Sequence, residues 1–322
     1  MATTFSGDVG YRGIVKLNDV ILLATGGNIN LAHNPIFSSG VWGAGYQNAS
    51  DQVAYADNYL QLDGSIACEM TAGEGFNAVK AFAFTNRGAA AGTKLAILPN
   101  GESGFSGFGW CTSLSFSSSQ DAILTADMNW SSYVDGTNNV ITTGASTNSE
   151  LGASEGKLPM AYNGLYPYWA NKLFGEDGIT EITDIMNWTA SYSSSVEFLK
   201  CCGSGQALKD SAGAPLAPDY IVLGSMTAEG SYTVFKLEGD FDPEAYHAQT
   251  QLKIEVDTPA STAETSHKHV IFLPKIVKSS GGTAIQSGSG FITADFSFSA
   301  VGDGKNPPLA LDPTEASPDE GE

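Results

Sequence analysis

Two stretches far apart in the chain resemble each other, and this internal repetition constrains the fold more than any other feature. Residues 123–136 read ILTADMNWSSYVDG, and residues 291–304 read FITADFSFSAVGDG. Six of the fourteen positions are identical, and four more exchange one apolar residue for another. Large apolar residues alternate with small or polar ones in both stretches, which is typical of strands with one buried face. The repetition predicts two β-rich units of the same fold.

Two weaker matches lie upstream in the same order. Residues 95–99 (LAILP) resemble 270–274 (VIFLP), and residues 59–66 (YLQLDGSI) resemble 234–241 (VFKLEGDF). Their common order favours a duplication that relates about 11–133 to 166–301. We therefore expect the strands at 123–130 and 291–298 to occupy equivalent positions of two β-domains, in separate sheets.

The remaining patterns predict a mainly β fold, because runs rich in Thr, Val, Tyr and Phe alternate with Gly, Asn and Asp. We predict two tandem β-sandwich or barrel-like domains, 1–135 and 158–301, with a linker at 136–157 and a disordered acidic tail at 302–322. The predicted strands are 11–17, 20–23, 54–62, 79–84, 95–98, 113–116, 123–130, 179–188, 196–199, 220–223, 232–237, 252–256, 269–273 and 290–298.

Each domain is expected to carry one short flanking helix. Asp242 is a suitable N-cap and Pro243 a suitable first-turn residue, so a helix is predicted to begin there. Its counterpart in the first domain is expected near 75–81. A helix over 158–174 is an alternative for that segment, although Gly164 and Pro167 count against it.

The charge balance excludes several classes of protein. The chain has 15 Lys and Arg against 35 Asp and Glu, a formal net charge of −20, so sequence-independent nucleic-acid binding is not expected. The longest apolar run, 20–24, is far too short for a membrane span. No secretory signal is visible at the N-terminus, so we expect cytoplasmic synthesis with reduced thiols.

Catalytic and metal-binding signals are almost absent. No phosphate-binding, dinucleotide-binding, nucleophile-elbow or HExxH motif occurs, and the glycine-rich segment 101–109 is interpreted as a turn, so neither an enzyme nor a cofactor is expected. His267 and His269 would share one strand face and are a weak metal candidate. We favour the alternative that they are solvated residues of an edge strand beside Lys268. The four cysteines are expected to be small buried side chains.

Two loops stand out, 34–52 and 203–218. The first sets three aromatic residues, Phe37, Trp42 and Tyr46, among Gly and Ser. They can fold back on their own domain, or form an arm that inserts into a neighbouring subunit, since aromatic residues anchor interfaces. We name them as candidate self-assembly residues.

These features together resemble the tail tube (major tail) proteins of bacteriophages. The resemblance rests on LTADMNWSSY and ITADFSFSAV, which end the two repeats, and on IVLGSMTAEGSYTVFKLEGD at 221–240. It implies β-sandwich domains that close side by side into rings, trimeric and pseudo-hexameric for a two-domain chain, which stack into a hollow tube. The long acidic tail departs from the family pattern.

The resemblance also implies a place and partners. The protein would be a virion component, made in the host cytoplasm, that contacts its own copies and the tape measure and tail terminator proteins. DNA would pass through the lumen without specific binding, and an acidic wall would repel its phosphates. Alternatively, the acidity only keeps the chain soluble.

Two other functions remain open. One is a different virion or surface structural protein, such as a capsid decoration or fibre protein. The other is a carbohydrate-binding β-sandwich, for which exposed tryptophans would be the stacking platforms; the candidates are Trp42, Trp110, Trp130, Trp169 and Trp188. Of these, Trp130 and Trp188 lie in alternating strands, so we expect them in the core instead.

Overall fold

The chain folds into large antiparallel sheets with one short helix, as the computed structural model shows. The mainly β fold class predicted from the sequence is therefore confirmed. The structure describes residues 14–32, 35–37, 54–57, 60–70, 74–87, 92–98, 104–119, 122–135, 138–142, 170–175, 181–199, 217–237, 251–257, 268–285 and 291–313.

The first half of the chain forms ten strands and the helical segment among the described residues. The strands are β1 (Ile14–Leu17), β2 (Val20–Ile21), β3 (Leu23–Ala32), β4 (Pro35–Phe37), β5 (Ala54–Asp57), β6 (Leu60–Glu69), β7 (Thr93–Leu98), β8 (Gly104–Ser119), β9 (Thr125–Val134) and β10 (Val140–Thr142). Helix α1 (Glu74–Lys80) continues into a π-helical turn, η2 (Ala81–Thr85).

The second half forms eleven strands among the described residues. They are β11 (Ala170–Phe174), β12 (Glu181–Ile182), β13 (Ile185–Ser193), β14 (Val196–Leu199), β15 (Tyr220–Leu223), β16 (Thr227–Leu237), β17 (Leu252–Asp257), β18 (Lys268–Leu273), β19 (Lys275–Ile285), β20 (Phe291–Val301) and β21 (Ala310–Leu311). The helix predicted at Asp242 lies outside the described residues.

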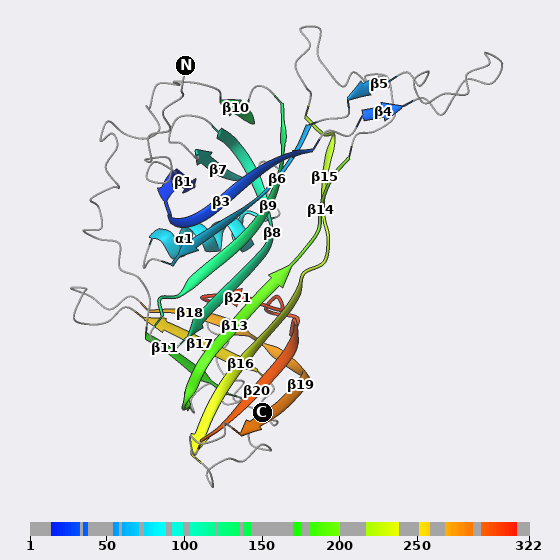
Figure 1. The fold of residues 1–322 in the computed structure, drawn as a ribbon. Coiled ribbons are helices and arrows are strands. Elements are labelled where there is room, and N and C mark those ends of the chain that lie inside the picture. The colour runs from blue at the N-terminus through cyan, green and yellow to red at the C-terminus, as the bar shows by residue number, and fades with distance from the viewer. Residues whose placement is uncertain are drawn as a thin grey trace, which may run out of the picture.

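One twelve-stranded sheet runs through the whole molecule (Figure 1). Its central strands follow the order β3-β6-β9-β8-β13-β16-β20-β19. Strand β8 bends out of this row and also pairs with β7, which leads on to β1 and β2. A five-stranded sheet, β12-β11-β17-β18-β21, forms the second layer of the second half.

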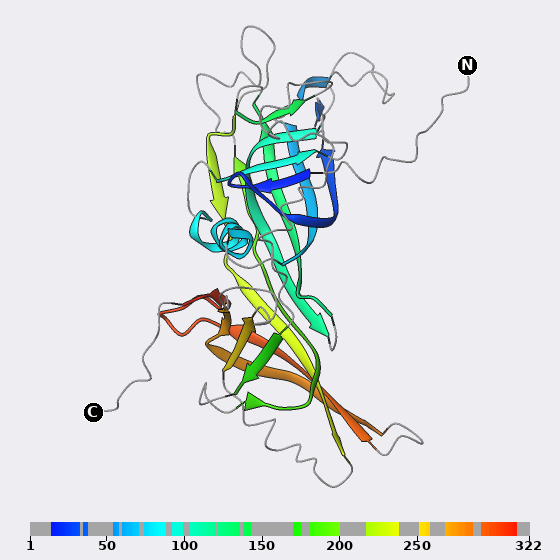
Figure 2. The same cartoon turned by 90° about the vertical axis from the view of Figure 1, so that its left-hand side faces the viewer.

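The two halves repeat one strand order. The row β3-β6-β9-β8 is followed by the row β13-β16-β20-β19. In both rows, the four neighbouring strands are the first, second, fourth and third of that row in chain order. Each half also carries a projecting hairpin at the same point, β4–β5 and β14–β15. Figure 2 shows the first half above the second, with the long strands running through both. However, β9 and β20 lie in one continuous sheet, so the prediction of separate sheets is wrong.

The pairing registers fix which residues correspond. Gly64 lies opposite Trp130, and Gly230 lies opposite Phe298. The β8–β9 pair has a bulge between Cys111 and Ser113, and the β19–β20 pair has one between Lys278 and Ser280. Likewise, the bulge of β3 at Ala24/Gly26 is at the position equivalent to the bulge of β13 at Ile185/Asn187. The two rows therefore match in their bulges as well as in their strand order.

The upstream sequence matches were out of register, although the match at 123–136 was correct. Gly64 and Gly230 correspond, so the true match of DGS in β6 is EGS at 229–231 in β16. Strand β7 takes the place of β17, which pairs with β11 as β7 pairs with β1. The match of 95–99 with 270–274 is therefore wrong.

Several local predictions are also wrong. Residues 79–84, predicted as a strand, lie in α1 and η2, whereas the helix expected near 75–81 is present. The glycine-rich segment 101–109 is no turn from residue 104 onward, because β8 begins there. The alternative helix over 158–174 fails at its end, which is β11. Strand β10 falls inside the predicted linker and pairs with β8.

The predicted disorder of the acidic tail is wrong for residues 302–313. Leu309 and Leu311 are buried, and β21 pairs with β18. Apolar residues at this point of the tail complete the second layer, so the chain is held to at least Asp312. Residues 314–322 lie outside the described residues.

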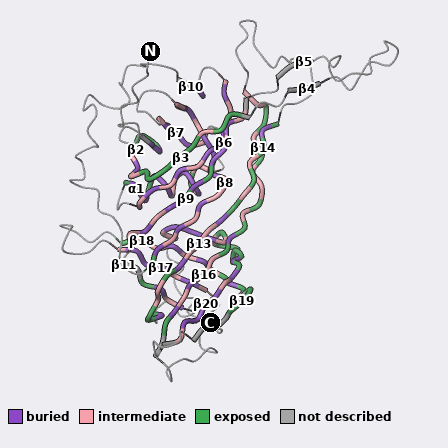
Figure 3. The backbone as a smooth tube through the Cα atoms, viewed as in Figure 1, coloured by how far each residue is buried: buried purple, intermediate pink, exposed green. Residues whose placement is uncertain are grey.

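Buried residues alternate with more exposed ones along the central strands, as in β13 and β16 (Figure 3). The buried face packs against α1, η2 and the second-layer strands in one apolar core that includes residues of both halves. Trp110, Trp130 and Trp188 are at most 2% exposed, so they offer no platform for a sugar. No helix in the described part of the chain is long and apolar enough to cross a membrane.

Gly64 should be intolerant of any side chain. A Cβ there would lie 2.3 Å from the Asn28 carbonyl oxygen and 2.6 Å from the Trp130 ring. We expect Gly64→Ala to lower the free energy of unfolding by about 1–3 kcal/mol or more, because the clash involves backbone. Gly26→Ala is the control, because its Cβ would meet no atom closer than 3.8 Å. Equal urea midpoints for the two variants would contradict the close packing of Gly64.

Candidate assembly interface

The two halves are joined through the backbones of β8 and β13. Seven successive residue pairs connect them, from Ser113 opposite Ser193 to Ser119 opposite Asn187. Leu114 and Tyr192, which face each other in this joint, are 0% and 2% exposed. The joint is therefore both a hydrogen-bonded ladder and a part of the core.

Polar contacts from η2 strengthen this joint. The Tyr192 hydroxyl donates to the carbonyl of Ala83 at 3.0 Å. Burial, together with the nearby Cys111, raises the pKa of the Tyr192 hydroxyl well above its usual value, so it remains a donor at neutral pH. Beyond the end of β13, the Arg87 guanidinium donates to the Ser194 hydroxyl and, at 2.5 Å, to the carbonyl of Gly224. These contacts tie the base of the second hairpin to the first half.

The second hairpin, β14–β15, covers part of the face of the sheet that points away from the main core. Phe198 of β14 contacts Trp110 and Tyr133 of the first half, each with ring centroids 5.6 Å apart. Trp110 and Tyr133 stack on each other at 5.9 Å. These three rings form a small cluster that is separate from the main core. A hairpin of one half thus covers the end of the other half's sheet.

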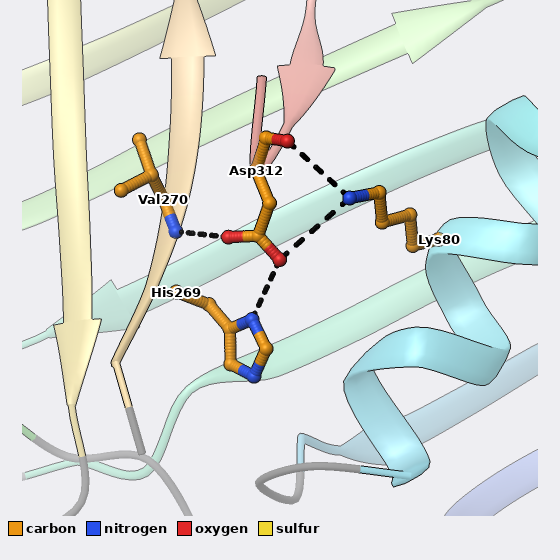
Figure 4. A network of polar contacts seen from close by, with 4 residues as sticks. All are labelled: Lys80, His269, Val270 and Asp312. Carbon is orange, nitrogen blue, oxygen red and sulfur yellow. Dashed lines mark hydrogen bonds and ion pairs between the residues drawn. The ribbon is translucent and has the colours of Figure 1, made fainter. Parts of the chain in front are cut away.

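A third contact joins α1 to the second layer, around Asp312 (Figure 4). The Asp312 carboxylate accepts hydrogen bonds from the His269 ring at 2.7 Å and from the Val270 amide at 2.8 Å. Lys80 of α1 donates to the Asp312 carbonyl at 3.3 Å, and its amino group lies 3.8 Å from the carboxylate. Phe76, also on α1, stacks on the His269 ring at 4.1 Å.

His269 therefore has a structural role. Its side chain is 13% exposed, so the description of a solvated edge residue is wrong for it. His267 lies outside the described residues. Among the residues that the structure describes, no group of three or more His, Cys, Asp or Glu side chains could hold a metal ion. The metal candidate gains no support from this geometry.

The same contacts determine the pKa of Asp312. Its burial would raise the pKa of the carboxyl group, but the hydrogen bonds from His269 and Val270 and the charges of His269 and Lys80 outweigh burial and hold the pKa below its usual value. A carboxylate whose pKa is lowered by folding stabilises the fold while it is ionised.

Asp312→Asn should therefore destabilise the chain in a pH-dependent way. At pH 6 we expect the free energy of unfolding to fall by about 1.5–3 kcal/mol, the usual value for a hydrogen bond to a charged group. The contribution of Asp312 is complete above its ordinary pKa of 3.8 and is lost as the pH falls through the lower folded-state pKa. The gap between the urea midpoints of parent and variant should thus shrink at about pH 3.

Asp19→Asn is the control for this prediction. Asp19 makes an exposed ion pair with Lys94 at 2.8 Å, and such pairs contribute about 1 kcal/mol or less. A gap for Asp312→Asn that stayed the same at both pH values would mean that the carboxylate's charge is not what stabilises the contact.

The outer face of the central sheet is polar along its length. Hydroxyl and amide side chains pair across neighbouring strands: Ser117 with Thr125 at 2.8 Å, Thr189 with Ser231 at 2.9 Å, Ser193 with Thr227 at 3.0 Å and Asn129 with Ser113 at 2.8 Å. Such cross-strand pairs stabilise a sheet without burying apolar surface. This face can remain in contact with water.

The charges on this outer face are mostly negative. Register and burial place five acidic side chains on it: Asp63, Glu69, Asp127, Glu229 and Asp295. Asp127 and Asp295 occupy equivalent positions of the two halves, as do Asp63 and Glu229. Among the side chains described on this face, Lys275 is the one base. Five acidic side chains from both halves thus share one defined surface.

The structure places the predicted arm residues only in part. Phe37 ends β4, but nothing is described of its side chain, and Trp42 and Tyr46 lie outside the described residues. Their role in assembly stays a prediction. Sequence reasoning missed Arg87, Phe198 and Asp312. Arg87 is one of only two arginines in the chain, which was the available signal.

The thiols have no assigned chemistry. Cys68 and Cys111 are free and buried. Burial raises the pKa of each to about 12, so both stay protonated and unreactive at neutral pH. The expectation of small buried side chains is confirmed for these two, and Cys201 and Cys202 lie outside the described residues.

Comparison with known families and with curated proteins gives no match to this chain: no family model matches it, and no curated protein does.

Proposed function

We propose that this chain is a structural protein that assembles with its own copies into rings, and that the rings stack into a hollow tube of the bacteriophage tail type. The proposal rests chiefly on the β8–β13 joint. That joint connects the last strand of one half's row to the first strand of the other half's row. The two edge strands of the row are equivalent to β13 and β8, and in this proposal they pair with each other between neighbouring copies as β13 pairs with β8.

Strands β19 and β3 are those equivalents. Strand β19 corresponds to β8, because they pair with the equivalent strands β20 and β9 and have a bulge at the same place of that pairing. Strand β3 corresponds to β13, because they pair with the equivalent strands β6 and β16 and have bulges at matching places. Within the described part of the chain, β3 and β19 each pair on one side only. An unpaired edge is a template for another strand.

The composition of β3 supports its use as an interface. The strand is ten residues long, LATGGNINLA, and has no charged residue or proline that would oppose pairing. Leu31 is 42% exposed, whereas Tyr192, at the equivalent position of β13, is 2% exposed. The difference arises because β8 lies beside Tyr192, and no strand described in the structure lies beside Leu31 on that side.

The arrangement of these edges favours ring closure. Because β3 and β19 are different strands at opposite ends of the row, their pairing is head-to-tail, and a head-to-tail contact makes a ring if its rotation closes. A ring of about three chains would place six equivalent half-rows side by side. The second-layer strands and α1 cover one face of the row, so the polar face is the one that can line the lumen.

An acidic, hydroxyl-rich lumen suits the passage of DNA. Carboxylates on a wall repel phosphates, and hydroxyls offer no fixed positive charge to hold them. In this proposal the protein is a virion component whose partners are its own copies and the tape measure and tail terminator proteins. The DNA passes without specific binding, and no catalysis is involved.

The β3–β19 pairing predicts one register between copies. Transferring the β8–β13 register places Leu31 opposite Gly281, as Tyr192 lies opposite Leu114. With Cys201→Ser and Cys202→Ser as background, the pair Leu31→Cys and Gly281→Cys should form disulfides between copies upon oxidation. The measurement is a ladder of covalent oligomers on a non-reducing gel, which for a closed ring ends at the ring size.

The matched control is the pair Asn30→Cys and Gly281→Cys. A shift of one residue turns the side chain to the other face of the strand, so this pair should give little cross-linking. Rings that are seen by electron microscopy but give no ladder with the first pair would contradict the proposed register. A protein that remains monomeric at high concentration would contradict self-assembly itself.

The charge of the polar face gives a separate prediction. Asp127→Lys with Asp295→Lys should leave assembly intact but give particles that retain double-stranded DNA, because Lys neutralises phosphates and releases counterions. The control is Asp19→Lys with Glu181→Lys, which makes the same charge change at exposed residues away from this face. DNA retention is measured by co-sedimentation at two salt concentrations. Equal retention by both variants would place the DNA path elsewhere.

A further inference from the structure

Two exposed valines mark the end of the outer face in the second half. Val277 of β19 is 55% exposed and Val301 of β20 is 44% exposed. They lie on the same face of the sheet, because Val277 pairs with Ser299 and Val301 lies two residues further along the strand. Large apolar side chains on an otherwise polar face suggest a contact surface.

The equivalent positions of the first half are occupied by Trp110 and Tyr133. Trp110 lies opposite Ser131, one residue before the bulge pair of β8, as Val277 lies opposite Ser299 before the bulge pair of β19. Tyr133 follows Ser131 by two residues, as Val301 follows Ser299. Trp110 and Tyr133 are the residues that the β14–β15 hairpin covers. Val277 and Val301 thus form the second copy of a docking site.

The second copy of the hairpin is β4–β5. Strand β14 begins three residues after the end of β13, and β4 begins three residues after the end of β3. Phe37 occupies the position of Phe198, because Pro35 pairs with Asp57 as Val196 pairs with Leu223. Hairpin β14–β15 reaches its site because β13 is paired with β8. Hairpin β4–β5 would reach Val277 and Val301 once β3 is paired with β19 of another copy.

Both acceptor sites are apolar, and a phenylalanine stands at the same position of the first strand of each hairpin. The first-half site is built of two large aromatic residues, and the hairpin brings Phe198 and Ile221 to it. The second-half site has two valines, and in the equivalent hairpin Phe37 pairs with Ala54 across a bulge, where Phe198 pairs with Ile221 in β14–β15.

We infer that Val277 and Val301 form the acceptor for hairpin β4–β5 of a neighbouring copy, with Phe37 at its centre. This inference deepens the proposed function and rests on it, because it takes the β3–β19 pairing as given. It identifies an arm contact inside the ring, in addition to the backbone ladder, and its partner is a second copy of this chain.

The test is a second cysteine pair, Phe37→Cys with Val277→Cys, in the same Cys201→Ser and Cys202→Ser background. It is oxidised beside the Leu31→Cys and Gly281→Cys pair. We expect both pairs to give covalent oligomers. Phe37→Cys with Phe235→Cys is the matched control, since Phe235 is 37% exposed but lies near the other end of β16 and β20, and it should give none.

Each outcome decides between the two proposals. Oligomers from the Leu31 pair without oligomers from the Phe37 pair would overturn the arm contact and leave the ring proposal standing. Oligomers from neither pair would overturn both. A Phe37–Val277 disulfide within a single chain, seen as a faster-migrating monomer, would show that the hairpin docks on its own copy and would also overturn the inference.

A charge substitution tests the contact without cross-linking. Val277→Asp should raise the protein concentration needed for assembly by at least about tenfold, because a carboxylate would be buried against aromatic rings. Phe235→Asp should change it less than about twofold, since the equivalent residue in the first half is already Glu69. If both variants keep the fold and circular-dichroism melting of the parent but assemble equally well, the inference fails.

Discussion

The antiparallel ladder between β8 and β13 is the contact on which the molecule depends. Without it, β8 and β13 would each leave a long row of backbone donors and acceptors unpaired, and each half would be a separate small sandwich. With it, the sheet is continuous and the core is shared. The hairpin contact at Trp110, the Arg87 contacts and the Asp312 network all connect the same two halves, and their geometry depends on the fixed register of this ladder.

The ladder also explains why the ends of the molecule are unusual. When two similar rows of strands join edge to edge, the first strand of one row and the last strand of the other remain at the edges of the sheet. Here these strands are β3 and β19, and among the described residues each has a partner on one side only. Natural proteins usually protect such edges with charge, proline or a covering loop. Here β3 has no charged residue or proline, whereas β19 carries Lys275 and Lys278 before its run of serine and glycine. Exposed Leu31, Val277 and Val301 all correspond to buried or covered residues at the internal joint. The residues that are exposed at the two edges are thus the counterparts of the residues that the internal joint buries or covers.

The strand content and the repeat could be predicted from the sequence because both depend on local patterns. Period-two alternation gave most strands, and the TAD motif placed β9 and β20 in equivalent positions. Predictions failed where tertiary contacts override local preference. The glycines of β8 allow close packing, as at Gly107 beside Asn139, rather than a turn. The apolar residues at 79–84 enter a helix because α1 and η2 cover the core face of the sheet. The apolar residues at 309–311 are too few to predict order, yet they complete a layer.

The sequence by itself therefore determined that the chain is an acidic, mainly β protein with an internal sequence repeat and no recognisable catalytic motif. These properties follow from composition and from patterns within a few residues. Only the tertiary structure decided which edges pair, because hydrogen bonding between strands joins residues far apart in the chain and alternation does not specify the neighbour. It also decided that His269 donates to Asp312, that five acidic side chains share the outer face of the central sheet, and that Val277 and Val301 take the positions of Trp110 and Tyr133. Each of these depends on register, which is set by bulges and packing across the whole sheet.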